Sequence, residues 1–161
     1  MRSYVLGILS LALATMALSP TSVAAATSAP DAAMLAPVQR WIDAFNSAKT
    51  PLPEDVFTDD VVITDQFEPY VWTGKGAAHA WSERLNRSLT SPRVKDEHVV
   101  TESPRAFMID KAGDRVSFVI PATLTYVLDG KPGTDHALWL FVVAKSGAGW
   151  KIVADTWTRT D

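Results

Sequence analysis

The stretch that decides the fold runs from Val38 to Asp65, with VQRWIDAFN at 38–46, a proline-broken linker, and VFTDDVVITD at 56–65. In the first segment apolar residues recur three and four positions apart, which is the period of one helix face. The second segment is rich in β-branched residues and predicts a strand. We expect Trp41 on the helix and Asp65 at the strand end to face one cavity, whose walls the rest of the chain supplies.

Composition limits the classes of protein to be considered. The 161 residues are enough for one domain with a single core, and 47% hydrophobic with 20% charged residues is ordinary globular usage. A net charge of -3 offers no basic face for a nucleic acid, so no nucleic-acid partner is expected. The chain has no cysteine, which excludes cysteine nucleophiles and cysteine-ligated metal sites.

The N-terminal segment has the pattern of a targeting signal. Arg2 is followed by an apolar run over 4–18 and by the small residues VAAA at 23–26. This predicts a cleaved signal peptide over 1–26, and therefore a periplasmic or secreted protein. The alternative, a membrane anchor, would need about 20 apolar residues, so no membrane span is expected after signal removal. A flexible leader over 27–33 and one domain over 34–161 would follow.

Further along the chain, helix patterns are followed by strand patterns. The apolar spacing predicts a first helix from 34 to 45 with Asp31 as its N-cap, and a second helix over 75–89. Strands are expected at 93–101, 105–111, 114–128, 134–145 and 150–158, and the glycine-containing segments 112–114, 129–133 and 146–149 are expected as hairpin turns. Helices followed by a meander of strands indicate an α+β fold.

One long strand is apolar on both of its faces. Trp139 and Phe141 alternate with Leu138, Leu140 and Val142. Helices can cover only one of these faces, and the other needs a second cover. We therefore expect a homodimer through the outer sheet face.

Four motifs resemble one protein family. They are VQRW at 38–41, Phe-x-Asp-Asp-x-x-x-x-Asp at 57–65, GKGAA at 74–78 and GWKIV at 149–153. They are similar to the ketosteroid isomerase branch of the nuclear transport factor 2-like superfamily, which includes the SnoaL-like proteins. The resemblance covers about 37–158. It implies a cone in which a curved antiparallel sheet wraps around the N-terminal helices.

The resemblance also implies roles for three residues. Asp65 matches the aspartate that shuttles a proton between carbons in the isomerase. Trp41 and Trp139 stand where that family has its tyrosine and its protonated aspartic acid. An indole N–H can donate a hydrogen bond but cannot relay a proton. Each of these two tryptophans is thus a candidate donor to a ligand carbonyl, in a weakened oxyanion site.

Two aspartates are the candidate catalytic residues, and for each the sequence leaves two readings open. Among aromatic walls the Asp65 carboxylate would lose hydration and become a better base near neutral pH. It would otherwise cap local backbone N–H groups, as in an Asx-turn. Asp155 either points inward beside Asp65 or is a solvated charge at a strand end, because Trp150 and Ile152 favour the opposite face.

The pattern supports two functions. The first is binding of a small apolar or aromatic molecule in an aromatic pocket; the alternative is a cofactor-independent isomerase, dehydratase or hydrolase with Asp65 as general base. No metal is expected, since the histidines lack ligand spacing. No cofactor is expected either, and no glycine-rich phosphate loop is present. Resemblance to scytalone dehydratase-like relatives implies a histidine in the cone, for which His98 and His136 are candidates. The expected ligand contacts are Trp41, Phe45, Phe57, Trp72, Trp81, Phe118, Trp139, Phe141 and Trp157.

Overall fold

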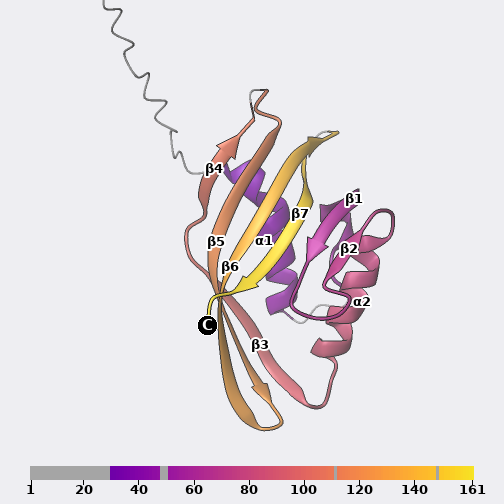
Figure 1. Cartoon of the computed structure of the whole chain (residues 1–161), viewed down its shortest axis with the longest axis vertical. Helices are drawn as coiled ribbons and strands as arrows, with labels where there is room; N and C mark the ends of the chain where they lie inside the picture. Colours follow the sequence, from indigo (N-terminus) through magenta and orange to yellow (C-terminus); the bar gives the residue numbers. More distant parts are fainter. Residues whose placement is uncertain (1–29, 48–50, 111, 148) are drawn as a thin grey trace, which may run out of the picture.

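Figure 1 presents a computed structural model that describes residues 30–47, 51–110, 112–147 and 149–161. Two helices and a curved, unclosed sheet confirm the predicted α+β fold. The helices are α1 (Ala32–Asn46) and α2 (Ala77–Leu89), with a short 3-10 turn, η1 (Glu54–Val56), between them. The strands are β1 (Phe57–Thr64), β2 (Val71–Thr73), β3 (Val94–Thr101), β4 (Arg105–Ile109), β5 (Arg115–Leu128), β6 (Lys131–Ser146) and β7 (Gly149–Arg159).

The start of α1 is fixed by the predicted N-cap. The Asp31 carboxylate accepts the N–H of Ala33 at 3.2 Å, which satisfies one of the free donors of the first turn. The helix therefore includes residues 32 and 33, which the sequence assigned to the leader. The predicted signal peptide over 1–26 lies outside the described residues.

The sheet is mixed, with the order β2-β1-β7-β6-β5-β3 and with β4 paired to β5. All its pairs are antiparallel except that of β1 with β7. The sequence predicted an antiparallel sheet, and this prediction is wrong for the parallel pair of β1 and β7. β1 and β7 come from opposite ends of the domain. Because no short turn connects them, the sequence has no local pattern that predicts their pairing. Their contact places the end of β1, where Asp65 follows, beside β7.

The turn between β5 and β6 is tighter than predicted. Asp129 and Gly130 have φ angles of 50° and 79°, as a two-residue type I′ hairpin requires. β5 therefore continues to Leu128 and β6 begins at Lys131, so the loop predicted over 129–133 is wrong for its last three residues. Residues 131–133 pair with β5 and lengthen the hairpin.

Both helices lie against the sheet and enclose the core. α1 contacts β7 and β3, while α2 contacts β1, β2 and β3 (Figure 1). α1 buries Val38, Trp41, Ile42 and Phe45 at the predicted spacing. None of the helices within the described residues is long and apolar enough to span a membrane.

The outer face of β6 has the predicted apolar character. Ala137 and Trp139 are buried, whereas Leu138 between them is 45% exposed. Leu140 and Val142, on the same face as Leu138, are half-buried. The two-residue period of the strand therefore separates a core face from an apolar outer face.

Candidate functional site

A pocket of about 150 Å³ lies between α1, α2 and the sheet, with Trp41 and Asp65 both in its wall as predicted. It is open to solvent on one side. Its lining residues come from both helices, from the segment after β1, and from β3, β5, β6 and β7. They are Trp41, Phe45, Asp65, Gln66, Phe67, Trp81, Arg84, Leu85, Ser88, Glu97, Val99, Leu124, Trp139 and Trp157.

The inner wall is a cluster of aromatic rings centred on Trp41. Its ring stacks on Trp81 and Phe45, with centroids 5.1 and 5.6 Å apart, and meets the edge of Trp139 at 5.2 Å. Trp139 in turn meets Trp157 edge-on at 5.1 Å. These are the preferred arrangements of aromatic pairs, so each ring is held by its neighbours. The walls thus present flat apolar surfaces in fixed orientations.

The outer part of the pocket is built on α2 and β3. Arg84, Leu85 and Ser88 follow Trp81 at intervals of three, four and seven, so all four side chains lie on one helix face. Glu97 and Val99, two residues apart, point to the same side of β3. Burial raises the pKa of Glu97, and a hydrogen bond with the Ser88 hydroxyl opposes that rise. We call this outer part, which includes Arg84, Ser88 and Glu97, the mouth of the pocket. The mouth has polar side chains, whereas the interior is aromatic.

Asp65 lies in the pocket wall and holds two hydrogen bonds. Its Oδ2 accepts the indole N–H of Trp81 at 2.9 Å, and its Oδ1 accepts the backbone N–H of Gln66 at 2.7 Å. Burial raises the pKa of Asp65, while these two bonds and the charge of Arg84 lower it by less. Asp65 therefore has features of both predicted readings: it binds a local backbone N–H and it is a desolvated carboxyl in the pocket.

Asp155 points inward but does not line the pocket. Its Oδ1 accepts the Trp139 indole N–H at 2.6 Å, and the residue is 1% exposed. Burial raises the pKa of Asp155 well above its ordinary value; the bond from Trp139 opposes the rise, and the charge of Asp65 adds to it. Asp155 is thus a buried carboxyl behind the Trp139 ring, electrostatically coupled to Asp65.

A β-bulge settles which way Asp155 faces. Val142 pairs with Ala154 but Val143 pairs with Ile152, so Val153 is an extra residue in β7. Because the alternation shifts at this point, Ile152 and Asp155 are both buried on the core side. Ile152, before the bulge, and Asp155, after it, were thus both correctly expected to face inward. Only the assumption of an unbroken alternation between them was wrong.

The hydrogen-bond partners of the indole N–H groups differ from those predicted. Trp139 is engaged with Asp155, so the predicted role of Trp139 as a donor to a ligand carbonyl is wrong in this arrangement. The indole N–H groups of Trp41 and Trp157 are buried, and neither has a hydrogen-bond partner in the described parts of the chain. Both side chains line the pocket, and their N–H groups are the indole donors of its wall that no protein acceptor occupies among the described residues.

Five of the nine predicted aromatic contacts line the pocket: Trp41, Phe45, Trp81, Trp139 and Trp157. The other four are buried behind the walls. Phe57 meets Trp81 edge-on at 5.8 Å, Trp72 packs on Phe67, and Phe118 lies beside Phe141, which contacts Trp139. These four hold the lining rings in place.

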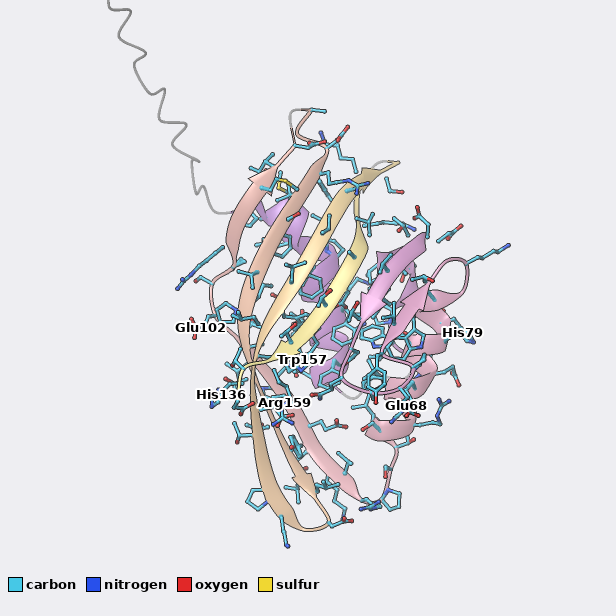
Figure 2. The ribbon with its side chains drawn as sticks, viewed as in Figure 1. Glu68, His79, Glu102, His136, Trp157 and Arg159 are labelled. Carbon is cyan, nitrogen blue, oxygen red and sulfur yellow. The ribbon has the colours of Figure 1, made fainter. Side chains whose placement is uncertain are left out.

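The histidines lie outside the pocket. His98 and His136 are exposed on β3 and β6, which rules out the histidine in the cone that the scytalone dehydratase-like resemblance implied. Figure 2 shows His79 on the outer side of α2 and His136 on the other side of the molecule, near Arg159. His79 contacts Glu54 at 2.9 Å, which raises its pKa. Within the described ranges no three histidine, aspartate or glutamate side chains form a potential metal site.

Sequence reasoning missed the residues at the mouth of the pocket. The α2 face that begins at Trp81 carried a usable signal for Arg84, Leu85 and Ser88, namely their helical spacing. Gln66 and Phe67, in the segment after β1, had no such signal. Glu97 and Val99 on β3, and Leu124 on β5, reach the pocket only because α2 packs against β3.

Residues 38–145 match the family model for the SnoaL-like domain. Among solved structures, a hexachlorocyclohexane dehydrochlorinase from Novosphingobium barchaimii is 13% identical with a TM-score of 0.66 and covers 81% of this chain and 86% of its own. A putative scytalone dehydratase from Novosphingobium aromaticivorans is 10% identical, with a TM-score of 0.65 and coverages of 80% and 83%. A ketosteroid isomerase-like protein from Erwinia carotovora atroseptica is 19% identical, with a TM-score of 0.62 and coverages of 81% and 95%. No curated protein sequence matches the chain significantly. These three solved structures have the same fold as this chain.

Proposed function

The chain belongs to the SnoaL-like domain family, and from that premise we propose that it binds a small planar molecule of about one aromatic ring in the tryptophan-lined pocket. The observation that carries the proposal is the lining of an open cavity by four indoles and two phenyl rings, in which the indoles contact one another. Flat faces in fixed orientations favour a flat ligand, which gains both apolar burial and ring contacts.

The volume of the pocket supports a one-ring ligand. About 150 Å³ is the size of a cavity that takes up benzene, and it is below the roughly 300–1,000 Å³ typical of sites for drug-sized molecules. We therefore expect a four-ring steroid to be too large for this pocket.

The test uses benzamide as the one-ring probe and a four-ring steroid ketone as the large one. We expect calorimetry to detect benzamide and not the steroid. Leu124→Trp fills the pocket from β5 and should abolish benzamide binding, while Leu128→Trp, at an exposed position of the same strand, should leave it unchanged. Urea unfolding of both variants checks that they are folded. Equal benzamide binding by the two variants would contradict the proposal.

A second candidate function is proton transfer with Asp65 as general base. Asp65 lines the pocket, and burial raises its pKa, which suits a base that works near neutral pH. Similar folds carry the names of a dehydrochlorinase, a dehydratase and a ketosteroid isomerase-like protein. In this reading Asp65 takes a proton from a bound ligand, and Trp41 or Trp157 donates to the oxygen on which charge develops.

Asp65→Asn separates this enzyme from a binder. The amide keeps an oxygen for the Trp81 or Gln66 N–H but accepts no proton, so ligand binding should persist while turnover falls by at least about a hundredfold. Deuterium exchange from solvent into a bound one-ring ketone provides the assay. Equal deuterium exchange by the wild-type and variant proteins would show that Asp65 is not the general base.

We further propose that the protein is exported and forms a homodimer through the outer sheet face. Leu138, Leu140 and Val142 support the dimer, since they form an apolar row on that face. Light scattering at micromolar concentration should give a dimer mass for the wild-type protein and a monomer mass for Leu138→Asp. A wild-type monomer would contradict the dimer. Recovery of a cell-associated chain that retains residues 1–26 would contradict export.

A further inference from the structure

A positively charged side chain, Arg84, lies at the mouth of the pocket, and its charge also acts on Asp65. Arg84 is the one lysine or arginine among the described lining residues. Its guanidinium lies 4.7 Å from the centroid of the Phe67 ring, and within the described parts of the chain it forms no ion pair. Other arginines of the chain, such as Arg40 and Arg93, are paired with Asp55 and Asp129. Arg84 is thus held by an aromatic face and keeps its N–H donors.

Two acids also line the pocket, but neither pairs with Arg84. The Asp65 carboxylate is occupied by the N–H groups of Trp81 and Gln66. Glu97 lies on β3 and is half-buried, and burial favours its neutral form. Arg84 therefore remains available to a group supplied by the ligand.

The geometry of the pocket orients such a ligand. The rings of Trp41, Trp81 and Trp139 form the inner part, and Arg84 lies one helical turn beyond Trp81 toward Ser88 and the mouth. A planar guanidinium matches a carboxylate with two parallel hydrogen bonds. A ring bound among the indoles would place a directly attached carboxylate at the mouth.

We infer that the pocket selects a one-ring aromatic carboxylate, with the ring against the indoles of the inner wall and the carboxylate on Arg84. This inference rests on the proposed binding function and adds a charge to the ligand class. Arg84 is in this account a specificity-determining residue. It discriminates between ligands of the same shape and different charge.

The test compares three probes of nearly identical shape: benzoate, benzamide and benzamidinium. Their dissociation constants are measured at pH 7 by calorimetry and by tryptophan fluorescence. We expect benzoate to bind about tenfold more tightly than benzamide, the factor that a charge-assisted hydrogen bond typically gives. Benzamidinium should bind most weakly.

Three variants at two positions of the same helix test whether the preference depends on Arg84. Arg84→Gln should bring benzoate to the affinity of benzamide, with benzamide itself changed by less than about threefold. Arg87→Gln removes an exposed arginine three residues further along α2 and should leave the tenfold preference intact. Arg84→Lys retains the charge without the planar fork and should give an intermediate preference.

The outcomes separate this inference from the proposed function. Benzamide binding without a preference for benzoate, or a preference that survives Arg84→Gln, would overturn the inference and leave the binding function standing. Tightest binding of benzamidinium would overturn it as well, by showing that Asp65 and Glu97 set the charge of the ligand. No binding of any of the three probes would count against both proposals.

Discussion

The buried carboxyl of Asp155 should make the stability of the folded protein fall as pH rises. Burial raises its pKa, so the folded chain keeps this proton over a pH range in which the unfolded chain has lost it. The unfolded state then binds one proton fewer, and the free energy of unfolding decreases with pH. The stabilisation is fully present below the ordinary aspartate pKa, near 4, and is lost as pH rises toward the folded-state pKa.

Asp155→Asn isolates this contribution. The amide oxygen still accepts the Trp139 N–H that Oδ1 accepts at 2.6 Å, while the titrating proton is removed. One proton corresponds to a slope of about 1.4 kcal/mol per pH unit. The free energy of unfolding of the variant minus that of the wild type should therefore increase by about that amount for each unit above pH 4, until Asp155 ionises.

Urea unfolding at intervals of half a unit from pH 4.5 to 8, followed by tryptophan fluorescence, measures this difference. Asp59→Asn, at an exposed position of β1, is a matched control that makes the same exchange of carboxyl for amide at the surface. A difference for Asp155→Asn that is flat over the whole range, like that of the control, would refute the account of Asp155 as a desolvated acid.

Three other predictions concern the supports of the pocket. Phe118→Ala, at a fully buried position beside Phe141, should lower the free energy of unfolding by about 3–5 kcal/mol in urea titrations; a loss below 1 kcal/mol would place this ring outside the core. Asn46 bonds both the backbone N–H and the carbonyl of Val99 at 2.8 Å, so Asn46→Ala should cost about 2 kcal/mol, and an unchanged denaturation midpoint would contradict this clamp between α1 and β3. Trp81→Phe removes a hydrogen bond that favours the charged form of Asp65, so the pKa of Asp65, followed by carbon-detected NMR, should rise further. A fall in this pKa would contradict the stabilising effect of the Trp81 hydrogen bond on the Asp65 carboxylate.

Much of the fold could be predicted because it depends on local patterns. The apolar spacing around Trp41 predicted α1, and Asp31 marked its start. The placement of Trp41 and Asp65 in one pocket followed from the helix and the strand end that carry them. Pairing across the domain was not accessible in this way. The parallel contact of β1 with β7 joins distant segments, and neither of them carries a turn signal for it.

The candidate site was less predictable, because it depends on tertiary packing. The orientation of Asp155 follows from one extra residue, Val153; the alternation gave two conflicting faces, but it did not show where a bulge would reconcile them. The engagement of Trp139 with Asp155 follows in turn from that orientation. Arg84 and Glu97 come together only where α2 lies against β3, so neither residue alone indicated a polar mouth.

The most direct test of the account is an NMR titration of the six indole N–H signals with benzamide, in a nitrogen-15-labelled sample of the domain. We expect saturable shifts for Trp41, Trp81, Trp139 and Trp157, which line the pocket. The signal of Trp150 should not move, since its ring lies elsewhere, beside Lys145 at 5.7 Å. Saturation of the four pocket signals with one dissociation constant would support a ligand site among the tryptophans. Unmoved pocket signals, or a shift confined to Trp150, would contradict it.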